Sequence, residues 1–173
     1  MQDNAIHGAA TDDIVRAQEL GDVLEFPVEA DTIIYQGSAV IMDGTSAGNA
    51  SNPEDGIAVA GAGSFVGFAL KRVDNRVGAV GFVGDAPGTG TAGAKRVRVQ
   101  ARGEMVLWIL GSVATVGQDV YALKSNEFTV TKPAAAHGYF VGRVARLSLQ
   151  QAATGGLTRA TVKYDAASML PSA

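Results

Sequence analysis

The segment from Lys95 to Leu110 constrains the fold of this chain more than any other. Apolar residues recur at its odd-numbered positions, whereas its first even-numbered positions are polar. Alternation with a period of two residues is typical of a β-strand whose two faces meet different surroundings. The apolar positions of the odd face are Val97, Val99, Ala101, Met105, Leu107 and Ile109.

The even-numbered face of the same segment changes character halfway along. A strand that is apolar on both faces must be covered twice, once by its own core and once by another sheet, a loop or a second subunit. We therefore expect self-association through the apolar end of this face. The face begins with Arg96, Arg98, Gln100, Arg102 and Glu104 and ends with Val106, Trp108 and Leu110.

Composition supports an all-β chain. Of the 173 residues, 22 are glycine and only 6% are aromatic, which favours short strands and tight turns around an aliphatic core. The net charge of −3 gives no general attraction to nucleic acid or to an anionic membrane. The absence of cysteine excludes disulfides and thiolate metal sites. The N-terminus lacks a basic segment followed by an apolar run, so we expect synthesis in the cytoplasm and no membrane span.

The chain divides into an arm, a β-domain and a tail. Residues 1–20 are polar and weakly patterned, with a short helix signal after Thr11, and form either an arm that orders on a partner or a frayed terminus. Strand signals run through residues 21–165, and residues 166–173 form a polar tail. The fold class we expect is all-β, a small β-barrel or β-sandwich. The core should contain Val97, Val99, Met105, Leu107, Ile109, Val120, Val141 and Val144.

Two further patterns concern the loops and an internal repeat. The glycine-rich segment Asp74 to Ala94 is long for a connection, and loops of this length are functional or mobile.

Motifs in the first half of the chain recur in order in the second half, which predicts either two sheets of one sandwich or two halves of one barrel. The pairs are Gly37-Ser-Ala-Val40 with Gly117-Gln-Asp-Val120, Phe65-Val-Gly67 with Phe140-Val-Gly142, and Lys95–Val99 with Thr158–Val162.

No arrangement in the sequence predicts catalysis, so we expect no enzyme, no cofactor and no metal site. Gly88 to Arg96 approximates a phosphate-binding loop, but Ala94 stands where its lysine belongs and a strand follows instead of a helix. His7 and His137 have no patterned nucleophile or carboxylate beside them. The row of arginines on the even face is more typical of a solvated surface than of a nucleic-acid site.

Taken in order, these motifs resemble the bacteriophage head decoration proteins, also called capsid cement proteins. The resemblance covers roughly Leu20 to Asp165. It departs from the family at the long glycine-rich loop and at the extended arm. The motifs that carry it are Gly21-Asp-Val-Leu24, Gly37-x-x-Val40, Phe65-Val-Gly67-x-Ala69, the Val97-x-Val99 strand ending in Arg102-Gly103, Val116-Gly-x-x-Val120-Tyr121 and Gly142-Arg-Val144.

The resemblance implies a structural virion protein on the outside of an expanded capsid, bound to the major capsid protein as a homotrimer. It implies no direct contact with nucleic acid or membrane. We expect the arm to contact the capsid through Ile6, Ile14, Val15 and Leu20. The alternatives are an accessory β-domain of a phage tail or baseplate, and a small ligand-binding β-module.

Overall fold

The computed structural model describes residues 23–42, 50–51, 64–111, 113, 115–124, 127–133, 139–147 and 157–166. The predicted arm, and the tail beyond Ala166, lie outside these residues. Every regular element in the described ranges is a strand, so the all-β prediction is confirmed. The strands are β1 Val23–Pro27, β2 Ile33–Ile34, β3 Ala39–Met42, β4 Ala50–Ser51, β5 Ser64–Ala69, β6 Val73–Asp74, β7 Arg96–Gln100, β8 Arg102–Leu110, β9 Asp119–Lys124, β10 Glu127–Thr129, β11 Tyr139–Leu147 and β12 Leu157–Asp165.

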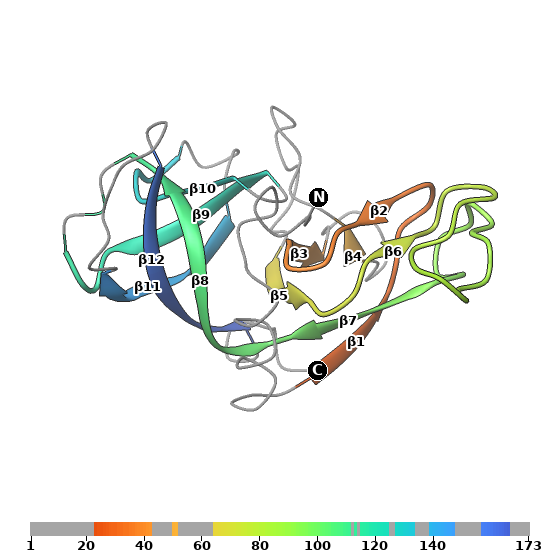
Figure 1. Ribbon diagram of the computed structural model, residues 1–173, viewed down its shortest axis with the longest axis horizontal. Coiled ribbons are helices and arrows are strands. Elements are labelled where there is room, and N and C mark those ends of the chain that lie inside the picture. Colours follow the sequence, from red (N-terminus) through yellow and green to blue (C-terminus); the bar gives the residue numbers. More distant parts are fainter. Residues whose placement is uncertain are drawn as a thin grey trace.

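The strands form a closed barrel, a five-stranded sheet and a short ribbon (Figure 1). The barrel follows the order β10-β8-β12-β11-β9, and the sheet follows β1-β7-β5-β3-β4. The ribbon pairs β2 with β6 and leads into the long loops at the end of the molecule opposite the barrel. The predicted barrel is therefore present, and β8 to β12, between Arg102 and Asp165, form it.

The segment from Lys95 to Leu110 forms two strands, where the sequence pattern predicted one. β7 pairs with β1 and β5 in the open sheet, whereas β8 pairs with β12 along its whole length in the barrel. Ala101, which separates them, is fully buried, and its carbonyl accepts a hydrogen bond from the Ala166 N–H at 2.7 Å. The alternation of apolar residues continues through this junction, so periodicity alone did not reveal the change of sheet.

The internal repeat has a structural basis in matching hydrogen bonds. The Gly37 N–H donates to the Ala69 carbonyl at 2.7 Å, and the Gly117 N–H donates to the Val144 carbonyl at 2.8 Å. Both glycines have a positive φ, 77° and 90°, which residues with a Cβ rarely adopt. The reverse bonds, from the Ala69 and Val144 N–H groups to the carbonyls of Ser38 and Gln118, measure 3.0 and 2.9 Å.

The glycine of each Phe-Val-Gly motif marks a close approach between strands. Any Cβ at Gly67 would lie 2.3 Å from the Gln100 carbonyl oxygen, and any Cβ at Gly142 would lie 2.3 Å from that of Lys163. Val40 pairs with Gly67 and Val120 pairs with Gly142, each beside a register shift. The halves thus repeat the same local geometry in two different sheets, so they are not two halves of one barrel.

The sheet and the barrel share one hydrophobic core. All eight predicted core residues are buried. Phe65 and Phe68 of β5 pack in the same cluster as Leu107 of β8, and the Phe68 ring lies 4.8 Å from that of Tyr164 in an edge-on contact. A second cluster, which includes Val97 and Val99, lies on the other face of the open sheet. Val97 and Val99 of β7 are buried in this second cluster, whereas Arg96 and Arg98 on the opposite face of the strand are exposed.

Candidate interaction surface

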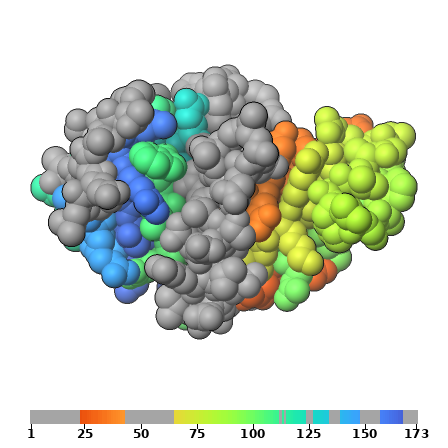
Figure 2. Space-filling view, viewed as in Figure 1, coloured from red at the N-terminus to blue at the C-terminus, as the bar shows by residue number. Residues whose placement is uncertain are grey.

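The residues between β6 and β7, here called the 75–95 loop, form an ordered lobe at the end of the molecule opposite the barrel (Figures 1 and 2). Its backbone is tied by internal hydrogen bonds. The Gly78 N–H donates to the Gly88 carbonyl at 2.9 Å, and the Gly88 N–H donates to the Ala79 carbonyl at 2.7 Å. Gly88 serves this close backbone pairing, because a Cβ there would lie 2.4 Å from the Arg76 carbonyl oxygen, whereas Gly78 has open space around it and a φ of 74°.

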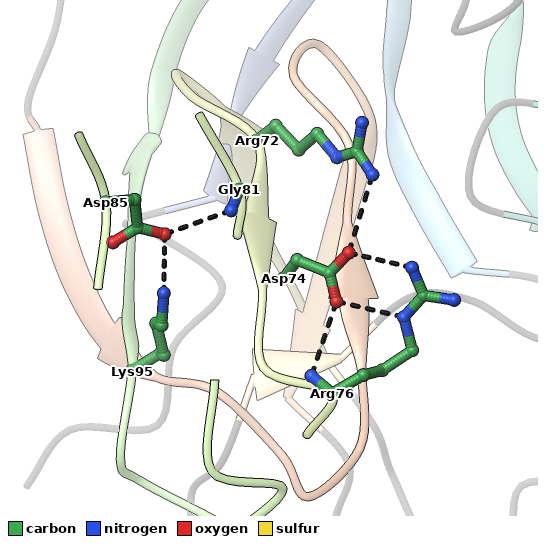
Figure 3. A network of polar contacts seen from close by, with 6 residues as sticks. All are labelled: Arg72, Asp74, Arg76, Gly81, Asp85 and Lys95. Carbon is green, nitrogen blue, oxygen red and sulfur yellow. Dashed lines mark hydrogen bonds and ion pairs between the residues drawn. The ribbon is translucent and has the colours of Figure 1, made fainter. Parts of the chain in front are cut away.

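Two neighbouring residues fasten the first end of the loop. The Asn75 side-chain amide donates to the carbonyls of Glu29 and Thr91, at 2.9 and 2.8 Å, and so joins three separate segments. The Asp74 side chain is only 1% exposed and accepts hydrogen bonds from the Arg76 Nε and Nη2 atoms at 2.9 and 2.8 Å (Figure 3). These bonds from Arg76 hold the pKa of Asp74 below its ordinary value, although burial opposes the shift.

An ion pair fastens the second end. The Lys95 ammonium donates to the Asp85 carboxylate at 2.5 Å and also to the Ala86 carbonyl, while the Gly81 N–H donates to the same carboxylate at 3.0 Å (Figure 3). Burial by itself raises the pKa of Asp85, but the hydrogen bonds from Lys95 and Gly81 hold it below its ordinary value. The carboxylate therefore stays charged at neutral pH and fixes the loop against the start of β7.

The tip of the loop exposes apolar side chains. Among the described residues, six large hydrophobic side chains are exposed, and four of them belong to this loop. Val77 is 76% exposed and Val83 is fully exposed, while Val80 and Phe82 are each 47% exposed. Several exposed apolar side chains on one loop that is held in place by its own hydrogen bonds are typical of a protein–protein contact. We call these four residues the apolar tip.

A pocket of about 820 Å³ lies beside the apolar tip, between the loop and the outward face of β1 and β7. Glu25 of β1 and Arg98 of β7, which are paired in register, lie on one wall, and Phe82 of the loop lies on another. Phe82 belongs both to the pocket lining and to the apolar tip, so the two surfaces meet at this residue.

Of the site residues predicted from the sequence, the structure describes only those on β8. Val106, Trp108 and Leu110 are half-buried on β8, opposite Thr161, Arg159 and Leu157 of β12. Their place on the barrel leaves the predicted self-association untested. The predicted capsid contacts, Ile6, Ile14, Val15 and Leu20, lie outside the described residues, as do His7 and His137.

The apolar tip was missed by sequence reasoning, although a signal was present. The run VGAVGFVG, residues 77–84, places four large apolar side chains in a glycine-rich segment that has no strand partner in the predicted domain. Apolar residues in a long loop must be buried or must serve an interface. Only the tertiary structure shows that these side chains face solvent.

Within the described ranges, no group of three or more histidine or acidic residues is placed to hold a metal ion. The same part of the chain contains no helix long and apolar enough to cross a membrane. No protein-family model matches the sequence, and a search of curated proteins finds no match either.

Proposed function

We propose that this chain is a decoration protein that binds the outside of an expanded phage head and stabilises it. The observation that carries the proposal is the apolar tip, held on a rigid β-scaffold by Asp74, Asn75 and the Lys95–Asp85 ion pair. Such a surface suits binding to a large, preformed partner. The resemblance to decoration proteins supplies the partner's identity, the major capsid protein.

The motifs of that resemblance take part in the repeated strand geometry. Gly37, Gly67 and Ala69 interlock the open sheet, and Gly117, Gly142 and Val144 do the same in the barrel. Mutual contacts among motif residues support the view that they belong to one fold pattern and did not arise by chance in a glycine-rich chain. These contacts support the fold that the resemblance implies, whereas the apolar tip supports the proposed function.

Stabilisation of a capsid needs no chemistry from the protein. A ligand that binds the expanded lattice more tightly than the unexpanded one, or than free subunits, stabilises that lattice by the difference in binding free energy. In this proposal the protein is a homotrimer joined through Val106, Trp108 and Leu110. The arm then adds capsid contacts through its apolar residues, at an ordering cost of about 1 to 2 kcal/mol per residue.

The test is to titrate the protein onto expanded heads that lack it and to measure occupancy after washing, with heat release of DNA as the readout of stabilisation. We expect copy numbers close to that of the major capsid protein and a higher temperature of DNA release. Replacing Val83 with Ser should weaken binding, whereas Val116→Ser, at an exposed valine outside the loop, should not. Binding confined to tails or baseplates would favour the accessory-domain alternative.

The contribution of the arm is tested by deleting residues 1–19. The deletion should leave the melting of the β-domain unchanged and reduce retention on washed heads. Equal retention of the truncated and full-length proteins would show that the arm is only a frayed terminus.

A further inference from the structure

We propose that the pocket beside the apolar tip receives an acidic segment of the partner protein, in which a carboxylate stands next to an apolar side chain. The choice of a capsid protein as the partner rests on the proposed function. The ligand class, an acidic segment with apolar side chains, rests on the residues that line the pocket.

The charges of the pocket favour an anion. Its lining carries four cations but only two carboxylates, although the whole chain has a net charge of −3. Each carboxylate is already paired, Glu25 with Arg96 at 2.6 Å and Asp85 with Lys95 at 2.5 Å. Lys71 and Arg98, both exposed, are left without a carboxylate partner among the described residues. A positive pocket on an acidic protein attracts an anionic group selectively.

The position of Lys71 shows that cationic and apolar features are combined at one place. Its ammonium nitrogen lies 5.2 Å from the centre of the Phe82 ring, in a cation–π contact. The ammonium is thereby held over the rim where the pocket meets the apolar tip. An incoming carboxylate would therefore meet a positioned cation, and the side chain beside it would meet an aromatic ring.

The walls of the pocket favour a peptide over a bare anion or a nucleic acid. Leu70, Val73, Phe82 and Pro87 all contribute apolar surface. Phosphate or a nucleic-acid backbone would satisfy the cations and leave this surface in contact with water. A volume of about 820 Å³ lies within the range of roughly 300 to 1,000 Å³ that is typical of pockets which enclose most of a ligand. Several side chains of an acidic, apolar segment fit these features together.

The direct test uses a fluorescently labelled hexapeptide that alternates Asp and Leu, with anisotropy as the readout. Two matched peptides, with Asn in place of Asp and with Ala in place of Leu, serve as controls. We expect saturable binding of the first peptide, at least tenfold weaker binding of the Asn peptide and measurably weaker binding of the Ala peptide. Equal binding of the Asp and Asn peptides, no binding of any, or full competition by a thymidine oligonucleotide would each overturn the inference.

The site is tested with the double variant Lys71→Glu, Arg98→Glu and with its milder counterpart Lys71→Gln, Arg98→Gln. The matched control is Lys132→Glu, Lys163→Glu, which changes the net charge equally at exposed lysines on barrel strands and loops. We expect the Glu pair to lose at least tenfold in affinity for the Asp-Leu peptide and the Gln pair to lose less. The control should stay within about twofold, and thermal melting checks that all three fold.

Expanded heads separate this inference from the proposed function. If the wild-type protein binds the peptide but not the heads, the proposed function fails, and the pocket keeps its acidic, apolar ligand class but loses the capsid protein as its partner. If the heads bind the Glu pair as tightly as the wild type, the pocket is not the capsid contact and the inference fails, while the proposed function stands. The expected result is loss of head binding in the Glu pair and not in the control.

Discussion

Replacing Gly67 with Ala tests the physical origin of the internal repeat. The added methyl carbon would lie 2.3 Å from the Gln100 carbonyl oxygen and 3.1 Å from the Ala101 Cα, both of them backbone atoms that cannot rotate away. The backbone φ of Gly67 is +138°, a conformation that residues with a Cβ rarely adopt. We therefore expect two separate penalties, one from overlap and one from the backbone conformation.

The magnitudes follow from those two penalties. Overpacking against fixed atoms costs about 1 to 3 kcal/mol or more, and an unfavourable φ costs about 1 to 3 kcal/mol, so Gly67→Ala should cost about 2 to 6 kcal/mol. Gly142→Ala meets the same 2.3 Å overlap, with Lys163, but its φ is not in the disfavoured range, so only the first penalty applies. Gly84→Ala, at φ 87° with nothing within 4 Å, should cost only about 1 to 2 kcal/mol.

The assay is urea unfolding of the three variants, followed by Trp108 fluorescence and by circular dichroism. The expected order of destabilisation is Gly67, then Gly142, then Gly84. A typical domain has about 5 to 15 kcal/mol of stability, so a cost at the upper end of the expected range leaves no folded Gly67→Ala protein, and in that case Gly142→Ala carries the comparison. If Gly67→Ala and Gly142→Ala were no less stable than Gly84→Ala, close strand approach would not be the reason for these glycines.

The remaining predictions concern the core, the loop network and self-association. Leu107→Ala should destabilise the fold by about 2 to 5 kcal/mol in urea unfolding, since the side chain is fully buried; an effect below 1 kcal/mol would contradict its place in the core. Asp74→Asn weakens the bonds to Arg76 and should cost about 1 to 3 kcal/mol at pH 7. The folded-state pKa of Asp74 is depressed, so the contribution of its carboxylate to the free energy of unfolding is present above about pH 4 and is lost as the pH falls through the folded-state value. The Asn variant should therefore lose less stability between pH 7 and pH 3 than the wild type. Self-association through β8 predicts a sedimentation coefficient above that of a monomer, which Trp108→Glu should lower; a wild-type protein that stays monomeric at high concentration would oppose it.

Much of the fold was readable from the sequence because strand periodicity and burial have the same cause. Val97 and Val99 alternate with polar neighbours and Leu107 continues their odd-numbered row, and all three are buried because alternate side chains of a strand face the same side. The antiparallel pairing of β9 with β10 is equally local, because the two strands are separated by only two residues in the chain. These features depend on local sequence alone.

The tertiary structure decided the features that depend on contacts between distant segments. The change of sheet at Ala101 follows from its pairing with Ala166, 65 positions further along the chain by residue number. The apolar tip and the pocket were equally hidden, because periodicity shows which residues are apolar but not whether another segment covers them. Lys95 and Asp85 illustrate the same limit: as isolated charges in a glycine-rich stretch they predicted nothing, and only the folded loop brings them to within 2.5 Å.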